Sequence, residues 1–310
     1  MGTSDRMDGV YSPVITPFDR NLNPDAAHLV AQCRWLLTQN VGLAVFGTNS
    51  EANSLSVDEK IDLLDALVGA GLPPARMMPG TGCCAVTESA RLTAHAVKLG
   101  CAGVLMLPPF YYKGVSDDGL FASFSQVIER VADSKLRVYL YHIPPVSNVP
   151  LSLALIERLI KAYPDTVVGI KDSSGDWANT KAMLDAGWDN FAIFPGSENF
   201  LLAALRLGGA GCISATANVN PAAIHALYAN WQAPDADQQQ AALDKIRSLF
   251  SGYVMIPALK AAVAHYSGDP TWMKVRPPLD AMTAAQQRAL VDNLDVAGFK
   301  MPGLMARAAE

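Results

Sequence analysis

The sequence predicts an α/β protein, a (β/α)8 TIM barrel followed by a C-terminal helical extension. Short apolar runs rich in β-branched residues alternate with stretches whose apolar residues recur at helical spacing, as in parallel sheets. The apolar runs are continuous, which indicates strands that are covered on both faces. Eight such units in about 230 residues favour a closed barrel. An open dinucleotide-binding sheet would need a Gly-x-Gly-x-x-Gly turn after an early strand, and the sequence has none.

The expected elements follow one another in regular order. Strands are predicted at residues 9–15, 42–47, 76–80, 103–107, 137–142, 166–171, 191–196 and 211–215. Helical periodicity is clearest at residues 56–70, 87–100 and 152–163. The Ser-Val-Asp-Glu run at 56–59 predicts a capping box, and Gly100, Gly187 and Gly208 are expected to end helices.

The pattern changes after Trp231, where a polar link leads into helical stretches at about 235–252, 255–267 and 280–297. We therefore expect a catalytic barrel domain at residues 1–232 and a C-terminal helical extension at residues 233–310. The extension has no strands of its own, so we expect it to pack on the barrel or at a subunit contact.

Composition excludes several classes of function. The chain has 310 residues, of which 17% are charged, and a formal net charge of −5 without a basic stripe, which argues against a nucleic-acid partner. No apolar run is long enough to span a membrane, and the N-terminus lacks the apolar core of a signal peptide, so we expect a cytoplasmic protein. The five cysteines and five histidines show no ligand spacing, and we expect neither metal nor organic cofactor.

Lys171 ends the apolar strand 166–171, at the end of the strand where barrel enzymes carry their active sites. Side-chain alternation places Lys171 on the same face as Gly169, which is expected to leave open volume beneath it. Desolvation disfavours the ammonium form, and a neutral amine can attack a ketone to form a Schiff base. The alternative is a lysine that reaches solvent or pairs with Asp172.

Other strand ends carry polar groups as well. Tyr141 is expected to point inward beside Lys171 and could transfer protons, or could simply fill the barrel with its hydroxyl bonded. Thr48 and Asn49 could cradle a carboxylate, or could form an ordinary helix cap. Tyr111 lies in an aromatic segment that could also be a lid or an interface loop.

Five segments together resemble one known family. They are FGTNSEANSLSVDEK, LPPFYYKGVSDDGL, YHIPPVSNVPLSLALIERL, GIKDSSGD and GGAGCISATANVNP, and they cover the chain in order. They resemble the dihydrodipicolinate synthase / N-acetylneuraminate lyase superfamily of class I, pyruvate-type Schiff-base aldolases and lyases. The resemblance implies a TIM barrel with C-terminal helices that forms a homotetramer or a homodimer and binds a 2-oxo acid such as pyruvate.

The resemblance also implies roles for single residues. Lys171 falls on the Schiff-base lysine, and Tyr141 falls on the tyrosine that shuttles protons. Thr48 falls on the first threonine of the family's Gly-Thr-Thr-Gly-Glu loop. Tyr111 falls on the relay tyrosine that a neighbouring subunit donates in the synthases. Ile213 falls on the residue whose backbone approaches pyruvate.

The chain departs from the family in the carboxylate loop. Asn49 replaces the second threonine and can still donate through its amide. Ser50 replaces a glycine and is expected to strain the turn if its φ is positive. The altered loop keeps open a non-catalytic 2-oxo-acid binder as an alternative function.

A second departure concerns the substrate. Val146 stands where the synthases carry an arginine for the aldehyde's carboxylate, and a valine cannot replace that contact. The pattern is closer to the sugar-acid lyases, with Ser173 and Glu198 as candidate ligands of substrate hydroxyls, although either could serve a surface or capping role. We expect reversible cleavage of a 2-oxo acid, hydroxylated or derived from a deoxy sugar, to pyruvate and an aldehyde. The alternatives are dehydration of a 2-keto-3-deoxy sugar acid and 4-hydroxy-tetrahydrodipicolinate synthesis.

Overall fold

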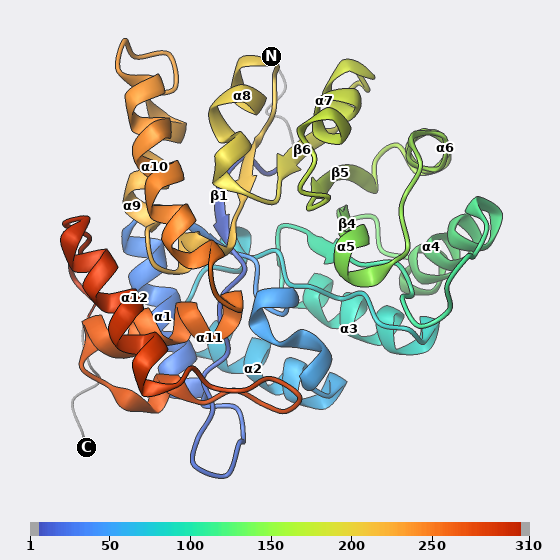
Figure 1. Cartoon of the computed structure of the whole chain (residues 1–310). Helices are drawn as coiled ribbons and strands as arrows, with labels where there is room; N and C mark the ends of the chain where they lie inside the picture. Colours follow the sequence, from blue (N-terminus) through green and yellow to red (C-terminus); the bar gives the residue numbers. More distant parts are fainter. Residues whose placement is uncertain (1–5, 305–310) are drawn as a thin grey trace. The chain divides into compact units, whose positions relative to one another are not determined.

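The computed structural model describes residues 6–304, which Figure 1 colours in chain order. These residues divide into two compact units. The first unit contains the described residues up to Gly9 together with Pro73–Ile213. The second contains Val10–Leu72 and the described residues from Ser214 onward.

The first unit is built around a parallel sheet in the order β3-β4-β5-β6. These strands span Val104–Met106, Val138–His142, Val167–Asp172 and Ala192–Pro195, and β7 (Gly211–Ile213) follows in the same unit. Every residue of these five strands is buried. Continuous burial explains why the strands read as apolar runs without alternation.

Helices alternate with the strands of the first unit. They are η3 (Pro74–Arg76), α3 (Val86–Lys98), α4 (Asp117–Val131), α5 (Pro144–Ser147), α6 (Leu153–Ala162), α7 (Trp177–Asp185), η4 (Glu198–Phe200) and α8 (Leu201–Arg206). Ser116, Ser152 and Asp176 cap α4, α6 and α7, because each side chain accepts a hydrogen bond from a backbone N–H of the first turn. These caps fix where each helix leaves the loop that follows a strand.

The second unit combines the N-terminal βα segment with the C-terminal helices. Strand β1 (Gly9–Ser12) pairs in parallel with β2 (Gly42–Leu43), and Tyr11 lies opposite Gly42. A Cβ at Gly42 would lie 2.2 Å from the Tyr11 ring, so a glycine is required there. The unit's helices are α1 (Ala26–Thr38), η1 (Thr48–Ser50), η2 (Ala52–Ser54), α2 (Val57–Gly69), η5 (Ala215–Asn218), α9 (Pro221–Ala229), α10 (Ala236–Ser251), α11 (Met255–Ser267), η6 (Pro270–Met273) and α12 (Ala284–Val296).

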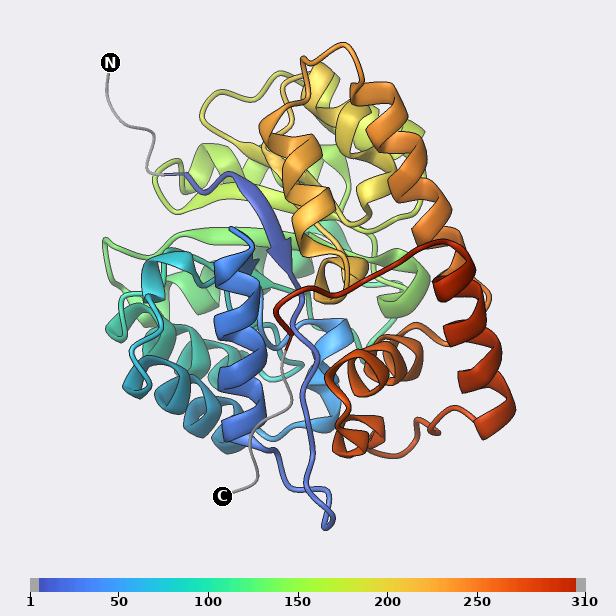
Figure 2. The same cartoon turned by 90° about the vertical axis from the view of Figure 1, so that its left-hand side faces the viewer.

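Helix α11 forms the core of the second unit. Nine of its thirteen residues are buried, and it contacts η1, η5, η6, α10 and α12. The helices drawn orange to red in Figure 2 agree with the three helical stretches predicted after residue 231. Within residues 6–304, no single helix has the length and apolarity to cross a membrane, although α10 and α11 meet that test as a pair bent by 107°.

Several local predictions are confirmed. Ser56 and Glu59 form the capping box, with Ser56 Oγ accepting from Glu59 N–H at 3.1 Å and Glu59 Oε2 accepting from Ser56 N–H at 2.8 Å. Gly100, Gly187 and Gly208 take positive φ angles of 81°, 62° and 87° just after α3, α7 and α8.

Several predicted strands are wrong in extent. Residues 76–80 form no regular strand, because Arg76 ends η3 and Gly80 makes a single parallel bridge to Leu105. The strands predicted at 9–15, 42–47 and 211–215 are shorter and end at Ser12, Leu43 and Ile213. Strand β5 also runs one residue beyond the predicted end, to Asp172. The expected domain boundary at residues 232 and 233 stays a prediction.

Candidate active site at the ends of β4 and β5

Lys171 and Tyr141 lie directly opposite each other on the adjacent parallel strands β5 and β4. The Lys171 Nζ donates to the Tyr141 hydroxyl at 3.4 Å and lies 4.4 Å from the centre of the Tyr141 ring. Both side chains are buried, at 2% and 3% exposure. The structure therefore holds a lysine amine and a tyrosine phenol in direct contact inside the first unit.

The side of β5 around Gly169 is filled, and the expected open volume beneath the lysine is wrong. A Cβ at Gly169 would lie 2.5 Å from Cδ1 of Tyr139, and one at Gly103 would lie 2.6 Å from its Cε2. The two glycines thus make room for the Tyr139 ring, which is fully buried. The Tyr139 hydroxyl accepts from Met7 N–H at 2.7 Å, and burial raises the pKa of Tyr139 to about 12. The neutral ring of Tyr139, rather than a cavity, therefore occupies the space beside Gly169.

His142 and Asp172 are the next pair of opposite residues on β4 and β5, and their hydrogen bonds hold the local backbone and neighbouring side chains. Asp172 accepts hydrogen bonds from Ser174 N–H, Ser174 Oγ and Thr180 Oγ1, at 3.0, 3.1 and 2.5 Å. His142 Nδ1 accepts from Leu151 N–H at 3.0 Å. Burial lowers the pKa of His142, and this effect outweighs the nearby Asp172 carboxylate. Since Asp172 bonds to Ser174 and Thr180, the alternative in which it pairs with Lys171 has no support among the described contacts.

Three more predicted residues lie just at or past the carboxyl ends of the first unit's strands. Ser173 follows β5, and its N–H donates to His142 O at 2.7 Å. Its hydroxyl lies against Gly196, where a Cβ would come within 2.0 Å of it. Glu198 begins η4 after β6 and is 1% exposed, and Ile213 ends β7 and is fully buried. They share the edge on which β5 presents Lys171.

Tyr111 is not part of the buried pair. Its side chain is 74% exposed, and its ring meets that of Tyr112 in a T-shaped contact at 5.3 Å. Lys113 Nζ holds this segment by donating to the carbonyls of Phe110 and Ser147, the latter at 2.7 Å. The aromatic segment is therefore fixed at the surface of the first unit.

Thr48 and Asn49 lie in η1 of the second unit, and their part in a site with Lys171 stays a prediction. The Ser50 backbone O accepts from Thr16 Oγ1 at 2.6 Å, and Ser50 Oγ accepts from Gly47 N–H at 3.2 Å. The expected strain at Ser50 is wrong, because the positive φ, 55°, belongs to Glu51 instead. A serine thus fits the position and adds a hydrogen bond inside the loop.

The second unit contains a buried ion pair that the sequence analysis did not predict. Glu51 and Lys260 contact each other with both side chains fully buried. Burial lowers the pKa of Lys260 to about 8, although Glu51 acts in the opposite direction. The signal was a lone lysine within the otherwise apolar run MIPALKAAVA.

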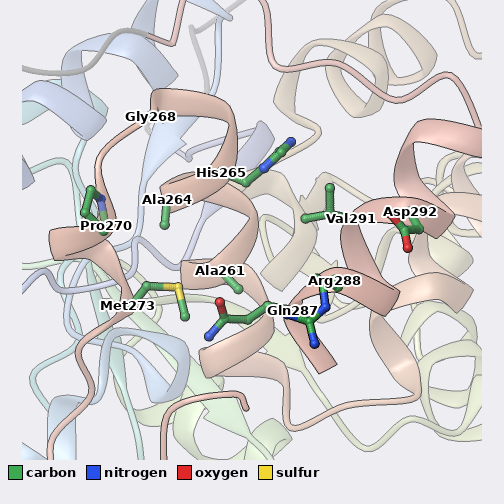
Figure 3. A pocket seen from close by; sticks show the side chains of 10 residues that line it. All are labelled: Ala261, Ala264, His265, Gly268, Pro270, Met273, Gln287, Arg288, Val291 and Asp292. Atoms are coloured by element: carbon green, nitrogen blue, oxygen red, sulfur yellow. The ribbon is translucent and has the colours of Figure 1, made fainter. Parts of the chain in front are cut away.

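A separate cavity of about 490 Å³ lies among α11, η6 and α12 (Figure 3). Its polar lining includes His265, Gln287, Arg288 and Asp292, with Met273 beside them. None of the residues predicted to form the site lines it.

The model of the dihydrodipicolinate synthetase family matches residues 6–297. A protein of Chloroflexus aurantiacus described as a DapA-like lyase is 34% identical over 286 residues, which cover 91% of this chain and 94% of that protein.

Two crystal structures are similar over nearly the whole chain. Dihydrodipicolinate synthase from Agrobacterium tumefaciens is 33% identical with a TM-score of 0.86, covering 93% of this chain and 99% of that one. YagE from E. coli K12, a member of the same family in complex with pyruvate, is 26% identical with a TM-score of 0.84, covering 94% and 99%. The expected α/β fold, a TIM barrel with C-terminal helices, is confirmed. The chain therefore belongs to the dihydrodipicolinate synthetase family of class I, Schiff-base-forming lyases and aldolases.

Proposed function

We propose that this enzyme reversibly cleaves a 2-oxo acid, hydroxylated or derived from a deoxy sugar, to pyruvate and an aldehyde. The contact between Lys171 and Tyr141 carries the proposal, since it joins a buried amine to a proton-transferring group. Pyruvate in the related YagE structure supports a 2-oxo acid as the ligand.

The reaction begins when Lys171 Nζ attacks C2 of the 2-oxo acid and water leaves, which forms an iminium ion. Tyr141 removes the proton of the C4 hydroxyl, and Thr48 and Tyr111 relay protons to and from it. The electrons of that O–H bond form the aldehyde carbonyl, and those of the C3–C4 bond move into the iminium to give an enamine. Protonation of the enamine at C3 and hydrolysis release pyruvate and free Lys171.

We assign binding of the substrate to the remaining candidate residues. Thr48 and Asn49 donate hydrogen bonds to the carboxylate of the 2-oxo acid, and the Ile213 backbone approaches pyruvate. Ser173 and Glu198 bind hydroxyl groups of the substrate's remaining carbons. The positions of Ser173, Glu198 and Ile213 at strand ends of the first unit support these roles.

The substrate class rests on Val146, which lies in α5 and is 59% exposed. A valine offers no charge to the second carboxylate that a synthase's aldehyde carries, and this favours a sugar-acid substrate. The relatives' names do not point specifically to sugar acids, and 4-hydroxy-tetrahydrodipicolinate synthesis is the second candidate, favoured by the 33% identity to a synthase. Because the iminium also acidifies C3, dehydration of a 2-keto-3-deoxy sugar acid is a further candidate.

We also propose that the enzyme is a cytoplasmic homotetramer or homodimer. The exposed pair Tyr111 and Tyr112 supports a subunit contact, since large exposed aromatic side chains are enriched at interfaces.

Borohydride trapping tests the proposal. Sodium borohydride with pyruvate should add one reduced pyruvyl group to the peptide containing Lys171, measured by mass spectrometry. Lys171→Ala should abolish both the adduct and turnover while its circular dichroism spectrum stays that of the native fold. An unmodified wild-type chain, or turnover above background in Lys171→Ala, would contradict covalent catalysis. Pyruvate release from a panel of 2-keto-3-deoxy acids then identifies the substrate.

A further inference from the structure

Glu51 closes the loop that carries Thr48 and Asn49. It is the residue shared by η1 and η2, and its backbone is left-handed, with φ 55° and ψ 34°. Residues with a Cβ adopt this conformation uncommonly, and only where the surroundings hold them there. The loop geometry therefore depends on what holds the Glu51 side chain.

Both oxygens of the Glu51 carboxylate are bound by the C-terminal helical segment. Lys260 Nζ of α11 donates to Oε1, and Arg276 N–H donates to Oε2 at 2.9 Å. Lys260 Nζ also donates to Lys274 O at 2.6 Å and lies 4.5 Å from the centre of the Phe18 ring. Two residues that lie more than 200 positions beyond Glu51 in the sequence thus hold its carboxylate.

A second contact holds the same segment further along the chain. The Arg276 guanidinium donates to both oxygens of Glu59, at 2.9 and 2.5 Å, and to the carbonyls of Leu22 and Ser54, at 2.9 and 2.6 Å. The chain from η1 to the first turn of α2 is therefore bound at Glu51, Ser54 and Glu59. These contacts hold the loop in a fixed position.

Stability alone is a poor reason for the Glu51–Lys260 pair. Desolvating two charges costs about as much as their attraction returns, and apolar replacements of similar volume are often as stable. Burial lowers the pKa of Lys260 to about 8, which shows that the site disfavours its charge. A pair retained at this cost suits a role in specifying one conformation of the loop.

We propose that Lys260 and Glu51 are positioning residues that hold Thr48 and Asn49 in the geometry that binds the carboxylate of the 2-oxo acid. This inference rests on the proposed function and deepens it. Neither residue touches the substrate, and both act through the loop.

The test uses the full chain and borohydride trapping of pyruvate at Lys171. Lys260→Met and Glu51→Gln each remove one charge with little change in volume. Both should raise the half-saturating pyruvate concentration roughly 10–100-fold, the range for lost charge-assisted hydrogen bonds, with the trapping rate at saturation changed by less than about 3-fold. Leu290→Ala, at a fully buried position of α12, is the control for general destabilisation and should leave half-saturation unchanged.

Hydrogen exchange provides a second measurement. The amides of residues 47–52 should lose protection in Lys260→Met and keep it in Leu290→Ala. Glu51→Gln keeps an oxygen for the Arg276 N–H, so it remains usable if Lys260→Met fails to fold.

The outcomes separate this inference from the proposed function. If the wild-type chain is not trapped, both fall together. If it is trapped and the two variants keep wild-type half-saturation, the inference alone is overturned. A rise of the same size in Leu290→Ala would also overturn it, because destabilisation would then explain the effect.

Discussion

Tyr141 packs its ring against the Lys171 amine and directs its hydroxyl to it, so one substitution can separate the two contributions. Tyr141→Phe keeps the ring and removes the proton-transferring oxygen. We expect turnover to fall roughly 10²–10⁴-fold, the range for lost acid–base catalysis, while pyruvate is still trapped at Lys171. The measurements are the rate of pyruvate release and the yield of the borohydride adduct.

Tyr139→Phe is the matched control. Tyr139 lies two residues earlier on the same strand, and its hydroxyl accepts from Met7 N–H rather than contacting Lys171. Its loss should cost about 1 kcal/mol of stability and leave turnover within a few fold. Equal rates in Tyr141→Phe and wild type would remove Tyr141 from the mechanism.

The pair itself could be predicted from the sequence, but its surroundings could not. A charged residue at the end of an apolar strand can be recognised from the sequence alone. Side-chain alternation along each strand then predicts that Tyr141 and Lys171 lie on the same face. Which large side chain fills the room beside Gly169 depends on the register between β4 and β5, and that is a tertiary property. The contact of Lys260 with Glu51 likewise joins α11 to the residue between η1 and η2, two segments that the sequence does not place together.

At the scale of elements, Gly169 shows how tightly β4, β5 and β6 pack. A Cβ there would lie 2.5 Å from the Tyr139 ring and 2.6 Å from the Ala192 carbonyl oxygen, and a backbone oxygen cannot move aside cheaply. We expect Gly169→Ala to lower the free energy of unfolding by about 1–3 kcal/mol, the usual cost of overpacking. The shift of the urea midpoint measures it.

Gly119→Ala provides the comparison within a helix. Gly119 lies in the first turn of α4, where the nearest heavy atom to a Cβ is Ser116 Oγ at 3.5 Å. Alanine should be neutral there or stabilise by up to about 1 kcal/mol. If Gly169→Ala and Gly119→Ala both leave the free energy of unfolding unchanged, the sheet around Gly169 adjusts more easily than these distances allow.

The order of elements could be predicted because strand and helix periods alternate so regularly, and the expected strand at 76–80 failed for a local reason. Leu105 N–H donates to Pro79 O, and Thr81 N–H donates to Leu105 O, so the segment does lie beside β3. Pro79 has no N–H to continue the ladder, and pairing stops at the Gly80 bridge. An apolar run can thus occupy a strand position without forming a regular strand.

At the scale of the whole molecule, acid stability should depend on Glu59. Hydrogen bonds from Arg276 lower the pKa of Glu59 below its ordinary 4.5. A carboxyl with a lowered folded-state pKa stabilises the fold above its unfolded pKa, and this stabilisation is lost as the pH falls through the folded-state pKa.

Glu59→Gln tests this dependence, since the amide can still accept from Ser56 N–H. The wild-type chain should be more stable than Glu59→Gln at pH 7. The gap in free energy of unfolding should close as the pH falls below 4.5, measured by urea denaturation at a series of pH values. A gap of equal size at pH 3 and pH 7 would contradict the assignment.

The exposed aromatic segment also bears on the assembly of the chain into oligomers. Tyr111 and Tyr112 are 74% and 73% exposed, and we expect a neighbouring chain to cover them. Light scattering should give two or four times the 33.0 kDa of one chain. Replacing both tyrosines by serine should shift the mass towards one chain. Val296→Ser, at a position of α12 that is 90% exposed, should not.

If Tyr111 serves the site of a neighbouring chain, two impaired variants should complement each other. Lys171→Ala lacks the nucleophile, so its oligomers should show no turnover. Tyr111→Phe lacks the relay hydroxyl, so its oligomers should turn over slowly. In mixed oligomers, some sites combine Lys171 from the Tyr111→Phe chain with Tyr111 from the Lys171→Ala chain, and these sites are intact. Co-expressed variants should therefore recover pyruvate release to a substantial fraction of the wild-type rate. If the mixed oligomers are no more active than the two variants separately, Tyr111 does not act across a subunit boundary.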